Sequence, residues 1–114
     1  MTVTFRQQGA MGVLTATGSL TASTADRFRE EAFGHCAAHA DLLCHVLDLS
    51  AVDFLDSSGL GALVALLKRV EKQGGQLRLA GLQKRVRIVL EITRAARVFD
   101  SFASVDEALA KLLD

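Results

Sequence analysis

The sequence predicts an α/β domain in which a mostly parallel, mixed β-sheet is packed with about four helices. Apolar strand segments alternate with amphipathic helical segments along the chain, in the order β-β-α-β-α-β-α-β-α. Residues 42–49 form a nearly unbroken apolar run, which is typical of a central strand covered on both faces. The length of 114 residues suits one domain, residues 1–114.

The N-terminal half predicts a β-hairpin, a helix and then the central strand. Alternating apolar and polar side chains mark the first strand, and β-branched residues mark the second, which ends at Gly18. In the helix, Phe28 and Ala32 recur at helical spacing with charged residues between them. The expected strands cover residues 3–7, 13–17 and 42–49, and the expected helix covers residues 25–38.

The C-terminal half continues the alternation. Its first helix has an apolar arc that leaves Gly61, Ala62 and Ala65 outside. The arc consists of Leu60, Leu63, Val64, Leu66, Leu67 and Val70. Ser104 and Glu107 match a capping box that opens the last helix. The expected helices cover residues 57–73, 84–92 and 105–113, and the expected strands cover residues 76–80 and 98–102.

Composition argues against several functional classes. The chain has 13 basic and 13 acidic side chains, and this zero net charge does not suit a general nucleic-acid binder. It has six Phe and no Trp or Tyr, so stacking platforms for bases or sugars are not expected. The longest apolar run, residues 60–67, is far shorter than a membrane span of roughly 20 residues. The N-terminus lacks a secretory pattern, so we expect a cytoplasmic protein.

Residues 46–61 form the most informative segment. An apolar strand leads through a loop into a helix that is opened by Asp56, Ser57, Ser58 and Gly59. At a helix N-terminus, unpaired N–H groups and the helix dipole favour negative charge, so a phosphate added to a serine there is tolerated. The alternative is an ordinary helix cap, in which Asp56 or Ser57 satisfies the first turn.

The same segment carries a family resemblance. The sequence DSSGLG at residues 56–61, preceded by LDL at residues 47–49 and FL at residues 54–55, resembles the signature of STAS-domain anti-sigma factor antagonists. KQGGQL at residues 72–77 and LEIT at residues 90–93 also resemble segments of that family, and the likeness covers nearly the whole chain. The resemblance implies a STAS-like fold and a bacterial regulatory protein that is not an enzyme.

By this resemblance, Ser57 is the residue phosphorylated by a partner that is both an anti-sigma factor and a serine kinase. The unphosphorylated protein would bind that partner and release the sigma factor, and phosphorylation would switch binding off. A phosphatase acting on the phosphoserine is a further expected partner. The expected partner-binding residues are Asp56, Ser57, Ser58, Gly59, Gly61, Ala62 and Ala65.

One position departs from the family pattern. Family members often have an acidic residue shortly after the second strand, in a pattern like Gly-Glu-Leu-Asp, where this chain has Gly18, Ser19, Leu20 and Thr21. If that acid contacts the kinase, Thr21 implies a divergent partner or poor phosphorylation. The alternative within the family is an accessory subunit of a membrane transport complex that binds its ATPase.

No catalytic residues, metal site or cofactor are expected. His35 and His39 share a helix face close to Cys36, Cys44 and His45, which leaves a metal pair as an alternative. However, no carboxylate joins them, and the cysteine spacing is not that of a zinc finger. Gly-x-Ser-x-Gly and a phosphate-binding loop are absent. In a reducing compartment the two cysteines are not expected to form a disulfide.

Basic residues gather in the C-terminal half. They are interpreted as solvated helix faces or, alternatively, as a patch that faces an acidic partner or a nucleotide. These residues are Arg78, Lys84, Arg85, Arg87, Arg94 and Arg97.

Overall fold

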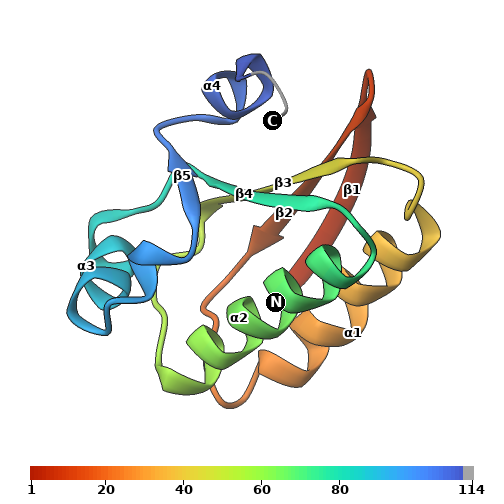
Figure 1. The fold of residues 1–114 in the computed structure, drawn as a ribbon. Coiled ribbons are helices and arrows are strands. Elements are labelled where there is room, and N and C mark those ends of the chain that lie inside the picture. Colours follow the sequence, from red (N-terminus) through yellow and green to blue (C-terminus); the bar gives the residue numbers. More distant parts are fainter. Residues whose placement is uncertain (112–114) are drawn as a thin grey trace.

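A five-stranded β-sheet forms the centre of the computed structural model, which describes residues 1–111. The strands lie side by side in the order in which they occur along the chain, as Figure 1 shows. The first pair is antiparallel and each later pair is parallel. The mixed, mostly parallel sheet expected from the sequence is therefore confirmed. The strands are β1 (Thr2–Gln8), β2 (Met11–Thr17), β3 (Cys44–Ala51), β4 (Gln76–Ala80) and β5 (Asp100–Phe102).

Within the described residues, three helices cover one face of the sheet and a short fourth helix lies on the other face (Figure 1). Each right-handed crossover between neighbouring parallel strands returns on the same side, which places the first three helices together. The last helix ends at Ala110, earlier than predicted, because Lys111 has an extended backbone; the rest of the predicted helix, including Leu112, lies outside the described residues. The helices are α1 (Ala25–Ala38), α2 (Ser57–Lys72), α3 (Lys84–Ile92) and α4 (Val105–Ala110), and an additional 3-10 turn is η1 (Ala95–Arg97).

The main hydrophobic core lies between the sheet and the first three helices. Leu14, Leu47 and Leu79 are in register on neighbouring strands, and all three are fully buried. Each such side chain that leaves water stabilises the fold by roughly 1.5–3 kcal/mol. Neighbouring residues of the same strands point to the opposite face, because side chains alternate along a strand. There a smaller cluster consists of Val13, Val46, Ala80 and Ala108.

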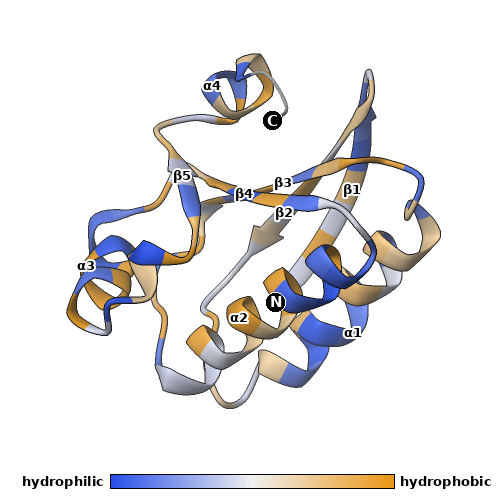
Figure 2. Cartoon of the chain, in the orientation of Figure 1, coloured by the Kyte–Doolittle hydropathy of each residue, from blue (hydrophilic) through white to orange (hydrophobic). Residues whose placement is uncertain are grey.

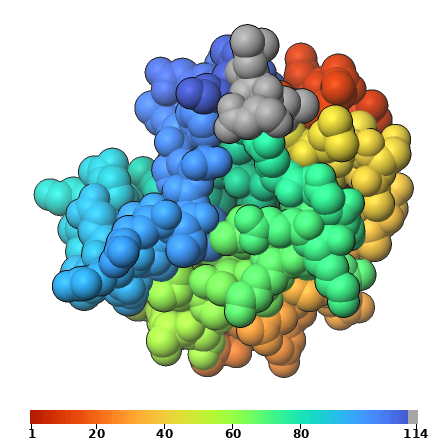
Figure 3. Space-filling model, in the orientation of Figure 1, coloured from red at the N-terminus to blue at the C-terminus, as the bar shows by residue number. Residues whose placement is uncertain are grey.

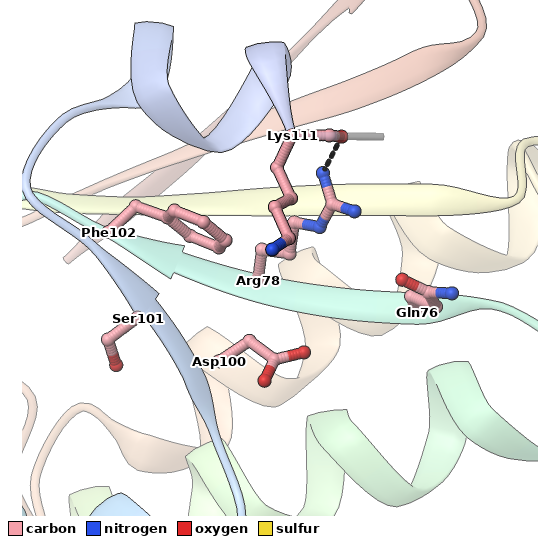
Figure 4. Close-up of a pocket in the computed structure, with 6 residues that line it drawn as sticks. All are labelled: Gln76, Arg78, Asp100, Ser101, Phe102 and Lys111. Atoms are coloured by element: carbon pink, nitrogen blue, oxygen red, sulfur yellow. Dashed lines mark hydrogen bonds between the residues drawn. The ribbon is translucent and has the colours of Figure 1, made fainter. Parts of the chain in front are cut away.

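Arg78 on β4 connects the sheet to α4 through hydrogen bonds. Its Nη1 donates hydrogen bonds to the carbonyl oxygens of Ala108 (2.7 Å) and Lys111 (2.8 Å), as Figure 4 shows for the second. The guanidinium also lies 5.6 Å from the centre of the Phe102 ring, beside a cavity of about 230 Å³. Arg78 is 2% exposed, so its assignment to a solvated basic face is wrong. It is buried because distant carbonyl groups satisfy its N–H donors.

The chain's three histidines gather around Phe5 at the edge of the sheet. The rings of His39 and His35 stack on Phe5 at 3.8 and 5.7 Å, and the ring of His45 lies tilted at 6.4 Å. His45 is fully buried, and neither of its ring nitrogens has a hydrogen-bond partner within residues 1–111. Gly12 makes room for this cluster, since a Cβ there would lie 2.6 Å from the Phe5 ring and 2.8 Å from His45 Nδ1.

Both cysteines are buried as free thiols. Cys36 faces the main core, where burial raises the pKa of its thiol to about 11. Burial also raises the pKa of the Cys44 thiol, in the central strand β3. A thiol with a raised pKa is protonated at neutral pH and reacts slowly. That the two form no disulfide with each other stays a prediction.

We expect stability to fall with decreasing pH below about 6.5 because of His45. Burial lowers the pKa of His45, so the folded protein keeps it neutral while the unfolded chain binds a proton there. Protons therefore favour unfolding in this range. After burial, the charge of His39 also lowers the pKa of His45, whereas the backbone of His39 and the charge of Asp41 raise it, and neither residue is changed in the test. Thermal unfolding at pH 7.5 and 5.5 should show a smaller loss for His45→Leu than for the wild type; equal losses would contradict this account.

Candidate functional site

Asp56 joins the first turn of α2 to the loop that enters α1. It is the N-cap of α2, and its Oδ1 accepts a hydrogen bond from the backbone N–H of Gly59 at 2.8 Å. Its Oδ2 accepts from the backbone N–H of Ala22 at 3.0 Å. These N–H groups, that of Gly59 first, lower the pKa of the Asp56 carboxyl and keep it ionised. The predicted helix cap is therefore confirmed, and the carboxylate also forms a contact between two loops.

Backbone hydrogen bonds fix the same two loops side by side. The N–H of Leu20 donates to the carbonyl oxygen of Phe54 at 2.9 Å, and the N–H of Asp56 donates to that of Leu20 at 3.3 Å. Leu20 and Leu55 form an isolated parallel bridge. The loops thus extend the pairing of β2 with β3 beyond the ends of the strands, which gives the start of α2 a defined position.

Gly59 allows α2 to approach this loop closely. A Cβ on Gly59 would lie 2.1 Å from the carbonyl oxygen of Leu20, a distance that real Cβ atoms do not show. Gly59 is accordingly buried. Gly61, two residues later, is exposed, and its nearest neighbour would be Nη2 of Arg29 at 3.8 Å. The two glycines of the motif therefore have different structural roles.

Ser57 and Ser58 are the first two residues of α2, and both are exposed. Within residues 1–111, neither hydroxyl forms a hydrogen bond with another group. Both hydroxyls are thus accessible at the N-terminus of a helix, where the dipole favours negative charge. The geometry accommodates a phosphate on either serine, and the choice of Ser57 rests on the family resemblance.

The prediction that Ala62 lies on an outward surface of α2 is wrong. Ala62 is fully buried, whereas Leu60 and Val64 are half-buried at the edge of the core. The small residues Gly59 and Ala62 therefore share the buried face of α2 with Leu63, Leu66, Leu67 and Val70. Gly61 is exposed, as predicted, and Ala65 is half-buried, like Leu60 and Val64. We call Ser57, Ser58, Gly61 and Ala65 the α2 surface.

Thr21, the position that departs from the family pattern, lies beside this site. Its backbone N–H donates to Oγ1 of Thr24 at 2.9 Å, and its hydroxyl lies 3.0 Å from that of Ser23. The next residue, Ala22, is the one that Asp56 binds. The sequence indicates this loop through Thr21. It does not indicate the roles of Leu20 and Ala22, because both residues act through backbone groups, which are the same in almost every residue type.

Comparisons with known proteins give a family match and several similar structures. A family model described as "STAS domain" matches residues 2–108. The anti-sigma-B factor antagonist of Bacillus subtilis (strain 168) is 34% identical over 83 residues, which is 73% of each chain. The crystal structure of an anti-sigma factor antagonist from Mycobacterium paratuberculosis has a TM-score of 0.82 at 27% identity, covering 95% of this chain and 90% of that one.

A transport protein is also similar in structure. The structure of the murine Solute Carrier 26 family member A9 anion transporter has a TM-score of 0.78 at 21% identity, covering 91% of this chain and 18% of that one. At this identity the likeness shows a shared fold alone. In residues 1–111 of this chain, every helix is too short or too polar to cross a membrane.

The two glycines of the motif should respond in opposite ways to alanine. Gly59→Ala should destabilise the protein by about 1–3 kcal/mol or more, because the new Cβ overlaps the carbonyl group of Leu20. Gly61→Ala should stabilise it by about 0.5–1 kcal/mol, because alanine loses less backbone entropy in an exposed helix. Urea unfolding of both variants is the measurement, and similar effects of the two would contradict the close approach at Gly59.

Proposed function

This chain belongs to the STAS domain family, and from that membership we propose that it is an anti-sigma factor antagonist switched by phosphorylation of Ser57. The expected STAS-like α/β fold is shown by the solved relatives. The observation that carries the proposal is the exposed Ser57 hydroxyl beside the capping carboxylate of Asp56, at the start of α2. The names of the most similar relatives support the same regulatory class.

In this proposal the unphosphorylated protein binds an anti-sigma factor that is also a serine kinase, and the sigma factor is released. The partner lies on the α2 surface, where Gly61 and Ala65 present little side-chain bulk and a partner backbone can approach closely. The kinase transfers a phosphoryl group to Oγ of Ser57, and a phosphatase removes it. The chain itself acts by binding and performs no catalysis.

Phosphorylation would act through local charge and not through refolding. A phosphate adds about −1.5 to −2 charge at pH 7. The helix dipole favours that charge by roughly 0.3–1 kcal/mol. Asp56 opposes it, but water and salt screen an exposed pair. Since both oxygens of Asp56 already accept backbone hydrogen bonds, the phosphate need not displace an existing contact of the fold.

Phosphorylation affects binding of the partner more strongly than it affects the fold. A surface that fits a neutral hydroxyl would have to bury a dianion next to the ionised Asp56 without a matching cation, which costs several kcal/mol. Affinity should therefore fall by about a hundredfold or more, since each ~1.4 kcal/mol is a factor of ten. The alternative of a transport accessory subunit is not favoured, because the likeness to a transporter extends to the fold alone.

We expect Ser57→Ala to bind the cognate anti-sigma factor constitutively and Ser57→Asp to bind it at least about tenfold more weakly. Ser58→Ala should still be phosphorylated, because the neighbouring serine is the acceptor. Phosphosite mapping by mass spectrometry and calorimetry with the cognate kinase test these outcomes. Phosphate on Ser58, or undiminished binding by Ser57→Asp, would refute the assignment of Ser57.

A bulky residue on the α2 surface should block the partner. Gly61→Arg should weaken binding of the anti-sigma factor by about tenfold or more, because the added side chain occupies the space of the approaching backbone. The matched control is Gly34→Arg, a change at an exposed glycine of α1 that has no neighbouring atom within 4 Å of its Cβ position. Equal affinities of the two variants would place the interface elsewhere.

A further inference from the structure

The exposed large apolar side chains gather on one side of the molecule, around α3. Within residues 1–111, five large hydrophobic side chains are exposed, and four of them are in this region. Phe54 and Ile88 are 39% exposed, Val98 58% and Ile92 76%. Ile88 and Ile92 are neighbours on the outer face of α3, one turn apart. Apolar surface that is gathered in this way indicates a contact site.

Exposed cationic side chains occur in the same segment as these apolar residues. Residues 84–98 contain five basic side chains and one carboxylate, a net charge of about +4 in a chain of zero net charge. The guanidinium of Arg85 lies 5.2 Å from the centre of the Phe54 ring, which joins α3 to the loop before α2. We call the following set the α3 patch: Phe54, Lys84, Arg85, Arg87, Ile88, Ile92, Arg94, Arg97 and Val98.

The patch is a protruding part of the surface. In Figure 3 the segment coloured cyan to light blue projects from the left of the molecule. Along α3 in Figure 2, orange apolar stretches alternate with blue polar ones. The inward side of the helix is already occupied, because Val86 and Leu90 are buried in the core. Ile88 and Ile92 are therefore not required to fill the core.

We propose that the α3 patch docks a partner protein that presents an apolar centre ringed by acidic side chains. An apolar centre with a polar rim is the usual anatomy of a protein interface. The net positive charge selects an acidic partner and speeds its approach. The proposal does not depend on phosphorylation of Ser57, since none of the patch residues is part of the α2 surface.

Other occupants fit the patch less well. The outer face of the nine-residue helix α3 carries only Ile88 and Ile92 as exposed apolar side chains, which gives a membrane little apolar surface to bury. The Glu91 carboxylate on this helix lies 4.0 Å from Nε of Arg87 and so already has a cationic neighbour. The bases of a nucleic acid could not stack on the Phe54 ring, since the guanidinium of Arg85 already lies over it. In a symmetric dimer, the patch would face a copy of itself, and the two positive charges would repel. An acidic protein surface satisfies both the charge and the apolar centre.

The test uses the full chain and two synthetic helical peptides of about 18 residues. Both have leucine on one face; one has glutamate on the other face and the second has lysine. The glutamate peptide should shift amide resonances of Phe54 and of residues 84–98, and its affinity should fall by about fivefold between 50 and 300 mM salt. The lysine peptide should not bind. Resonance shifts confined to another surface would overturn the proposal.

Matched variants localise the contact. Ile92→Asp should weaken binding of the glutamate peptide by about tenfold or more, and Val98→Asp should act in the same direction. Leu43→Asp should change it by less than about twofold, because Leu43 is 60% exposed but lies before β3, outside the patch. Binding of this peptide requires neither the kinase nor a phosphate on the protein, which separates this proposal from the proposed switch. Thermal unfolding confirms that each variant is folded.

Three outcomes would overturn the proposal. The first is an equal effect of Ile92→Asp and Leu43→Asp on peptide affinity. The second is binding to vesicles with about 30% phosphatidylglycerol that is lost in Ile92→Asp while the glutamate peptide does not bind, which would identify a membrane contact. The third is a dimer of the wild type in sedimentation that Ile92→Asp dissociates, which would identify a second copy as the occupant.

Discussion

The carboxylate of Asp56 is the contact on which the geometry of the site depends. One of its oxygens caps the first turn of α2, and the other binds the N–H of Ala22 at the entrance to α1. Because one bond comes from the first turn of α2 and the other from the loop before α1, they hold the helix against that loop. Gly59 then faces the carbonyl group of Leu20, and Ser57 faces solvent. A neutral or shorter side chain at position 56 would weaken both hydrogen bonds and, with them, the positions of Gly59 and Ser57.

Much of the fold could be predicted from the sequence, because its elements obey local rules. The strand alternation, the helical spacing of α1 and the Ser104 cap of α4 all act within a few residues, and the structure contains each of them. The predicted capping box is half formed: the N–H of Glu107 donates to Oγ of Ser104 at 3.1 Å, but the Glu107 carboxylate accepts from the N–H of Ala103 at 3.2 Å and not from that of Ser104. The mixed sheet followed from the alternation of these elements and the handedness of their connections.

The misplaced residues depend on contacts across the chain. The hydrophobic pattern of α2 places Ala62 on the wrong side of the helix, because this pattern is dominated by the large side chains. The closest contacts of a helix require small side chains, and Ala62 is buried at such a contact. Arg78 was assigned to solvent because of its charge, but carbonyl groups about 30 residues later along the chain satisfy it. The turn η1 follows Arg94, which has a positive φ of 63° that its residue type does not favour. For Ala62 and Arg78, tertiary contacts override a local preference.

The order of the strands also has a consequence for how the protein reaches its fold during synthesis. Every strand after β1 pairs with its predecessor in the chain, so each new strand and crossover helix can add to a sheet edge that already exists when it leaves the ribosome. Only β1 has to wait for a partner that is made later, which is β2. The site at the start of α2 needs Leu20 and Ala22, which are made before it. The α2 surface can therefore form before the ribosome has completed the C-terminal third of the chain.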